Sequence, residues 1–141
     1  MFPPKKIIVA MDGSEPSLKA VRAGSELARL AGSQLTILHV VLLPEYISPS
    51  TLENLRTELL KKSEQILEKA RAIAKEAKVE CATRTVETTH SVVETIVESS
   101  DKEKGNLIVV GSRGMTVGKL MLGSIAAGTA NLAHCPVLVV R

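Results

Sequence analysis

The chain has 141 residues, of which 45% are hydrophobic and 23% charged, and a formal net charge of +3. This length fits a single domain over residues 1–141, because domains usually have about 100 to 150 residues. The basic residues are mixed with acidic ones, and Phe2 and Tyr46 are the only aromatic residues of the Phe, Tyr and Trp type. Without a basic patch or aromatic stacking platforms, a nucleic-acid-binding protein is not expected.

Targeting signals and a disulfide framework are not expected either. The N-terminal run MFPPKKIIVAMDG has no cleavage site at secretory spacing. No apolar stretch approaches the roughly 20 residues that a membrane-spanning helix needs. The two cysteines, Cys81 and Cys135, are too few for a disulfide-stapled scaffold and are expected to be reduced. We therefore expect a cytoplasmic protein without a membrane partner.

The first half of the chain alternates short apolar runs with amphipathic segments. Residues 6–11 (KIIVAM) are almost wholly apolar, which is typical of a strand buried on both faces of a sheet. Ser14 can cap the helix that follows, and Gly32 ends it. Residues 34–41 are a second β-rich run, and residues 51–77 carry apolar side chains at helical spacing without Gly or Pro. They predict the longest helix.

The second half continues the alternation. Residues 79–86 mix charged and apolar side chains, which is typical of a strand at a sheet edge. A third helix follows, with a buried stripe of Val92, Val93, Ile96 and Val97. Residues 107–110 are a fully apolar strand that leads into a glycine turn, and the chain ends with a helix near residues 124–133 and a strand over residues 136–140.

Strict alternation of strands and helices predicts an α/β fold, a doubly wound parallel sheet of five strands with helices on both faces. We expect the strand order 3-2-1-4-5. In this order the strands are added toward one edge of the sheet up to the third strand and toward the other edge from the fourth strand on. A crevice is therefore expected beyond the carboxyl ends of the first and fourth strands, at Asp12 and Gly111. Open α/β sheets bind their ligands in such crevices.

Two glycine-containing segments meet at this crevice. Gly111 to Gly114 follow a buried strand, and Gly123 with Ser124 opens the last helix. Glycines let successive N–H groups point into one hollow, and a helix N-terminus adds the positive end of its dipole. Arg113 adds positive charge, so a polyphosphate is the expected ligand. The alternative interpretation is that these glycines only turn the chain and cap a helix.

Known catalytic patterns are missing from these segments. Neither the GxxxxGK[ST] phosphate loop nor the GxGxxG dinucleotide pattern occurs, and nothing in the sequence places a histidine near a nucleophile. We therefore predict no catalytic residue. Asp12, at the end of a buried strand, is expected to contact a ribose or a magnesium ion, or else to cap the first helix.

The runs IIVAMDGSE, LTILHV, NLIVVGSRG and LGS followed by CPVLVVR occur in this order. They resemble the universal stress protein family over essentially the whole chain. The resemblance implies the fold derived above, and it favours the branch of the family that binds ATP over the branch that does not. One difference from that branch is the spacing between Gly114 and Gly123, where this chain has eight residues, MTVGKLML, and the branch has nine.

The resemblance also implies roles for single residues. The adenosine moiety would contact Asp12 and the backbone near Ala10, and adenine would contact Val40. The phosphates would be held by Gly111, Gly114, Gly123 and Ser124. Ile125 follows at the start of the helix, and a magnesium ion carried with the phosphates would lie near Asp12.

The last strand predicts a partner. Val137–Val140 is wholly apolar and would lie at a sheet edge, and an edge without charge or proline invites pairing with another chain. We expect a homodimer through this strand, as the family resemblance also implies. Three functions follow: a dimeric regulatory sensor that binds ATP with magnesium in the stress response, a dimeric interaction module that binds no nucleotide, and, less supported, an enzyme that slowly hydrolyses ATP or transfers phosphate or adenylate.

Overall fold

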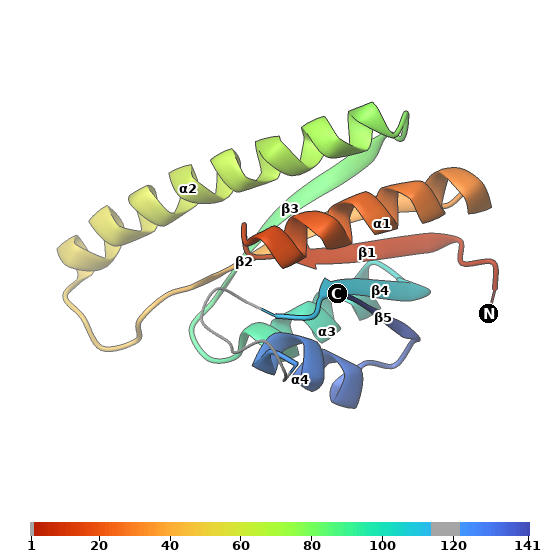
Figure 1. The fold of residues 1–141 in the computed structure, drawn as a ribbon. Helices are drawn as coiled ribbons and strands as arrows, with labels where there is room; N and C mark the ends of the chain where they lie inside the picture. The colour runs from red at the N-terminus through yellow and green to blue at the C-terminus, as the bar shows by residue number, and fades with distance from the viewer. Residues whose placement is uncertain (1, 114–121) are drawn as a thin grey trace.

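The computed structural model describes residues 2–113 and 122–141. Over these residues, strands and helices alternate as the sequence predicts (Figure 1). In chain order they are β1 (Lys6–Met11), α1 (Glu15–Ala31), β2 (Gln34–Leu42), α2 (Pro49–Glu76), β3 (Cys81–Thr88), α3 (Val92–Lys102), β4 (Leu107–Gly111), α4 (Ser124–Leu132) and β5 (Val137–Val140).

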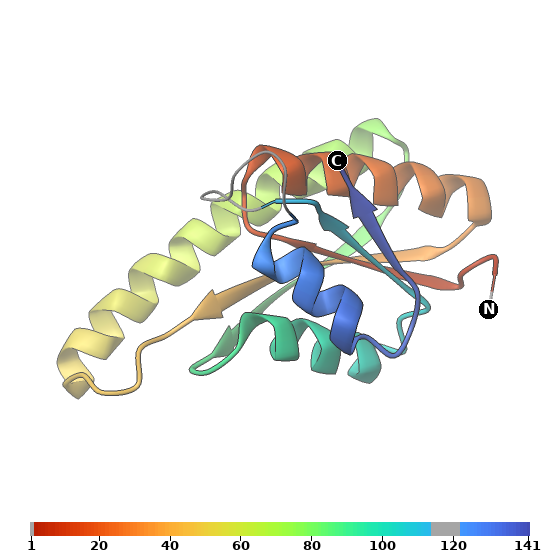
Figure 2. The same cartoon turned by 60° about the horizontal axis from the view of Figure 1, so that its bottom comes forward.

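The strands form one parallel sheet in the order β3-β2-β1-β4-β5, which confirms the predicted order. Helices α1 and α2 cover one face of the sheet, and α3 and α4 lie side by side on the other (Figures 1 and 2). The central strand β1 pairs with β2 on one side and with β4 on the other, so the strands are added toward one edge up to β3 and toward the opposite edge from β4 on. The carboxyl ends of β1 and β4 therefore open where a doubly wound sheet binds its ligand.

Successive side chains of β1 enter two different cores. Ile7 and Val9 pack on the side of α1 and α2, whereas Ile8 and Ala10 pack on the side of α3 and α4. All four are buried, and full burial of an aliphatic side chain stabilises the fold by about 1.5–3 kcal/mol. The continuous apolar run of β1 is explained by this burial on both faces.

Helix α1 begins and ends at the residues that the sequence indicates. The Ser14 side chain accepts a hydrogen bond from the Ser17 N–H at 3.4 Å, and Gly32 ends the helix with φ 68°. The helix lies close to the sheet, because a Cβ atom on Gly24 would be 2.5 Å from a methyl group of Val9. This close packing brings the first turn of α1 against the end of β4.

Helix α2 is the longest helix and starts at a Ser48 cap followed by Pro49. Its first turns extend beyond the carboxyl ends of the strands (Figure 1). Within the part of the chain that the structure describes, no helix is both long enough and apolar enough to cross a membrane.

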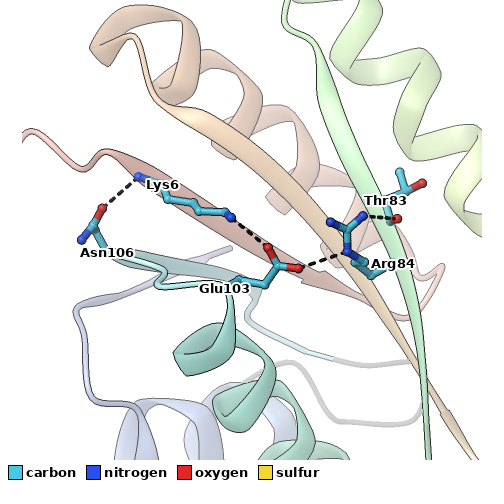
Figure 3. Close-up of polar contacts among 5 residues, drawn as sticks. All are labelled: Lys6, Thr83, Arg84, Glu103 and Asn106. Carbon is cyan, nitrogen blue, oxygen red and sulfur yellow. Dashed lines mark hydrogen bonds and ion pairs between the residues drawn. The ribbon is translucent and has the colours of Figure 1, made fainter.

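The amino end of the sheet is tied to α3 by a network of polar side chains (Figure 3). Glu103, just after α3, accepts hydrogen bonds from Lys6 Nζ at 2.8 Å and from Arg84 Nε at 3.0 Å. The bond from Lys6 is the main cause that holds the pKa of Glu103 below its ordinary value. The Asn106 side-chain oxygen accepts the backbone N–H groups of Lys5 and Lys6. These polar groups bind one another and hold the end of α3 against the sheet.

Candidate functional site

A pocket with a cavity volume of about 60 Å³ opens at the carboxyl ends of β1, β2 and β4. Its floor is formed by these strands, and its walls by the starts of α3 and α4 and the first turn of α1. The residues that line it are Ala10, Met11, Asp12, Ser17, Leu38, Val40, Val92, Ile96, Val110, Gly111, Arg113, Ile125 and Ala126. The pocket therefore lies at the predicted crevice.

Six of the residues selected from the sequence meet in this pocket. They are Ala10, Asp12, Val40, Gly111, Arg113 and Ile125, and they come from four different elements or their ends. Among the described residues, Gly123 and Ser124 lie beside the pocket, at the start of α4, and are not in its wall. Gly114 is outside the described residues.

The two glycine-containing segments are joined by a backbone hydrogen bond. The Gly123 N–H donates to the Ser112 carbonyl at 2.7 Å, and the Ser112 N–H donates to the Val140 carbonyl at 2.7 Å. The Gly123 amide is thus already engaged. The first intrahelical bond of α4 runs from the Ala127 N–H to the Gly123 carbonyl. The N–H groups of residues 124–126 therefore have no acceptor within the helix and point out of its N-terminus.

Gly111 has a packing role that the sequence does not reveal. A Cβ atom on this residue would lie 2.6 Å from the Pro16 carbonyl carbon and 2.7 Å from the Pro16 oxygen. These are backbone atoms of the first turn of α1, which have little freedom to move away. Glycine at this position lets α1 approach the end of β4. This packing supports the alternative interpretation for Gly111, in which the glycine serves the fold and not a ligand.

Asp12 starts the turn between β1 and α1. Its Oδ1 atom accepts the Ser14 N–H at 2.9 Å, and Gly13 follows with φ 88°, a left-handed conformation that favours glycine. Asp12 therefore orders the start of α1, in line with the expectation that this residue caps the first helix. The residue is also exposed at the mouth of the pocket, where its carboxylate can accept further hydrogen bonds.

The pocket is largely aliphatic, with polar side chains at its rim. Its polar side chains are those of Asp12, Ser17 and Arg113, and the Ser17 hydroxyl donates to the Ser14 carbonyl at 2.8 Å. The N-termini of α1 and α4 open at the same end, and helix N-termini favour anions. The arrangement suits a flat apolar group beside an anionic one.

A protein-only metal centre is not supported. Among residues 2–113 and 122–141, no group of three or more His, Cys, Asp or Glu side chains could hold a metal ion. Asp12 is the one carboxylate among the lining residues. Such a site fits a magnesium ion only when phosphate oxygens supply most of the ligands.

Sequence patterns did not select the other lining residues. Leu38, Val92, Ile96, Val110 and Ala126 come from strand interiors and helix faces, where an apolar pattern predicts burial but not the wall of a cavity. The register could have found two of these residues, because Ala10 pairs with Leu38 and Val110. All three are then neighbours on one face of the sheet.

Comparisons with known proteins agree with the fold and extend it. The family model of the universal stress protein family matches residues 3–141. The universal stress protein YxiE of Bacillus subtilis is 36% identical over 96% of this chain and 98% of its own length. A universal stress protein crystallised in complex with cAMP is 28% identical, covers 98% of this chain and 97% of its own, and has a TM-score of 0.72. The universal stress protein UspA of Lactobacillus plantarum, 21% identical, has the same fold with a TM-score of 0.86 over 97% of both chains.

Proposed function

The chain belongs to the universal stress protein family, and on this basis we propose that it binds an adenine nucleotide in the pocket at the ends of β1 and β4. The observation that carries the proposal is that six residues selected from separate parts of the sequence line one pocket. A similar family member binds cAMP, which supports this ligand class.

The size of the cavity indicates which part of the ligand it encloses. Ligand pockets commonly have volumes of about 300 to 1,000 Å³. The cavity here, at about 60 Å³, is far smaller, so it can take in only the edge of a planar base and not a whole nucleotide. The base would pack among Ala10, Val40 and Ile125, while ribose and phosphates lie at the mouth.

The polar groups at the mouth match the rest of the nucleotide. The exposed Asp12 carboxylate would accept a hydrogen bond from a ribose hydroxyl. Arg113, Ser124 and the opening N–H groups of α4 would bind phosphate oxygens, with the dipole of α4 adding to the attraction. With ATP, Asp12 would help to hold a magnesium ion, which would offset the negative charge of the phosphates. These residues bind and orient the nucleotide, and a regulatory role as a sensor follows if the bound state changes the surface or the assembly.

Calorimetric titration of the protein with ATP and magnesium, AMP, cAMP and GTP tests this function. Guanine has two exocyclic polar groups and adenine one, so aliphatic walls penalise guanine more strongly. We expect the adenine nucleotides to bind and GTP to bind far more weakly. A bound nucleotide at 100 times its Kd also raises the free energy of unfolding by about 2.7 kcal/mol. If no nucleotide binds at millimolar concentration, the proposal is wrong.

The alternative, a dimeric interaction module without nucleotide, is favoured by two observations. Gly111 is accounted for by its packing on Pro16, and the Gly123 amide is accounted for by its bond to Ser112. The enzyme alternative has less support, because the described lining residues include no histidine, cysteine or lysine to act as base or nucleophile. Titration with ATP separates the module from the nucleotide-binding protein.

We propose a homodimer through β5, which lies at the edge of the sheet next to β4. Leu138, in the middle of this strand, is 37% exposed. A Leu138→Lys substitution places a charge on the edge, and charged side chains oppose edge-to-edge pairing. We expect the wild type to sediment as a dimer at micromolar concentration and the variant as a monomer. Leu30→Lys, at an exposed position of α1, serves as control and should remain dimeric. A monomeric wild type contradicts the proposal.

A further inference from the structure

The end of β5 lies against the glycine-containing turn that follows β4. The Ser112 N–H donates to the Val140 carbonyl at 2.7 Å, and the Ser112 carbonyl accepts the Gly123 N–H at 2.7 Å. Val140 is also paired with Gly111 in the sheet register. These backbone contacts join β5, the turn and the start of α4, and Arg141 follows this junction directly.

Strand alternation indicates the face of the sheet on which the Arg141 side chain lies. Val139 packs on the core at the side of α3 and α4, whereas Val140 packs on the core at the side of α1 and α2. Successive side chains of a strand point to opposite faces, so that of Arg141 is expected on the side of α3 and α4. The pocket residues Leu38 and Val110 belong to the core on this same side. Arg141 therefore extends from β5 on the face that holds the pocket.

The guanidinium group of Arg141 is available to a ligand. Arg141 is exposed, and within the part of the chain that the structure describes no carboxylate forms an ion pair with it. An arginine side chain is always charged, and it can bind a phosphate group through two parallel N–H groups. Arg113 lines the pocket just after β4, the strand next to β5. The two arginines therefore bring positive charge to the ends of adjacent strands.

The order of the strands separates the first phosphate of a nucleotide from the later ones. In the proposed function the base contacts Val40 in β2 and the ribose contacts Asp12 after β1, and β4 and then β5 follow in the sheet. Neighbouring strands lie about 4.8 Å apart, so β5 is about 10 Å from β1. A phosphate on the ribose therefore meets Arg113 and the start of α4 first, and only a chain of further phosphates extends to Arg141.

We propose that Arg141 binds the terminal phosphates of the nucleotide and gives the site a preference for adenosine di- and triphosphates over AMP and cAMP. The inference rests on the proposed function and names the phosphate number that the site selects. AMP carries its one phosphate directly on the ribose, and cAMP closes its phosphate onto the ribose as a ring. Neither ligand extends past β4, so neither contacts Arg141.

The test is a calorimetric titration of the wild type and the Arg141→Gln variant with ATP and magnesium, AMP and cAMP. We expect the variant to lose affinity for ATP at least about tenfold, because a hydrogen bond between charged groups contributes more than a neutral one. Its affinities for AMP and cAMP should equal those of the wild type. Arg29→Gln is the matched control, since it removes the same charge from an exposed position in the last turn of α1, near the amino end of the sheet. This control should bind all three ligands as the wild type does.

A second measurement on the wild type does not depend on the folding of a variant. The side-chain Nε–H signal of Arg141 in NMR spectra should shift when ATP binds and stay in place when AMP binds. An unmoved signal with saturating ATP, or an Arg141→Gln variant that binds ATP as the wild type does, overturns this inference while the proposed function stands. Equal losses of ATP and AMP affinity in the variant, or a wild type that binds AMP as tightly as ATP, have the same meaning. If none of the nucleotides binds the wild type, both proposals are wrong.

Discussion

We expect the Gly111→Ala variant to lose about 3 kcal/mol of unfolding free energy, the upper part of the range for overpacked sites. The added methyl group would meet the Pro16 carbonyl at 2.6 Å, and these atoms belong to the backbone of α1. A side chain could rotate away from such a contact, whereas α1 can only move as a whole, away from the end of β4. Denaturant unfolding followed by circular dichroism measures the loss.

Gly32→Ala is the control for this variant. Gly32 has φ 68°, and a Cβ atom there would have no neighbour within 4 Å, so only backbone strain of about 1–2 kcal/mol is expected. If Gly111→Ala loses no more unfolding free energy than Gly32→Ala, α1 does not lie as close to the end of β4 as described above. A large loss means that weakened nucleotide binding by a Gly111 variant is not evidence of a phosphate contact at this residue.

The Ala10→Val variant should lose nucleotide affinity at least about 100-fold, which corresponds to about 2.7 kcal/mol of binding free energy. Ala10 is buried in the middle of the pocket floor, and two added methyl groups would occupy the space proposed for the base. The fold should not suffer, because filling a cavity commonly stabilises a protein by about 0.5–2 kcal/mol and valine suits a strand. Calorimetry and thermal unfolding measure the two effects separately.

Ala82→Val is the matched control, with the same chemical change in a strand of the same sheet. Ala82 lies in β3 opposite Thr36, outside the residues that line the pocket. Its affinity for nucleotide should equal that of the wild type. Equal affinity in Ala10→Val would show that the base binds elsewhere, and a collapse of stability in that variant would show that the cavity has no room for two methyl groups.

The order of the elements and the topology of the sheet could be predicted because each local signal agrees with the others. Continuous apolar runs such as β1 predict strands buried on both faces, and the helices between them leave a parallel sheet as the expected arrangement. The charged strand at one edge and the short apolar strand at the other were also predicted, and they are β3 and β5. The ends of elements were less well predicted.

The start of α2 and the position of β3 show why. The sequence prediction began α2 at Thr51, whereas Ser48 caps the helix and Pro49 is its first residue. Proline is well suited to that position, since its missing N–H would have no helical partner. Strand β3 starts at Cys81 instead of Val79, because Lys78 has φ 61° and the chain turns there before it enters the sheet.

The candidate site was predictable where strands end and less so where they pass through the core. Asp12 and Gly111 follow from topology alone, since they lie at the carboxyl ends of β1 and β4, the two strands between which the direction of strand addition changes. The hydrogen bonds of the backbone amides in the two glycine-containing segments were harder to predict. The sequence indicates that the glycine segments meet, but the bond from Gly123 to Ser112 depends on the path of the chain between them. Packing of Gly111 on Pro16 likewise joins residues that are distant in sequence.

The most direct test of the central claim is a titration with cAMP followed by amide NMR spectra of the labelled wild-type protein. If the pocket binds the nucleotide, the amide signals of Ala10, Val40, Gly111 and Ile125 should shift together with one saturating curve, while those of Lys6 and Asn106 at the opposite, amino end of the sheet stay in place. Saturable shifts confined to other surfaces, or no shifts at millimolar cAMP, would contradict the account.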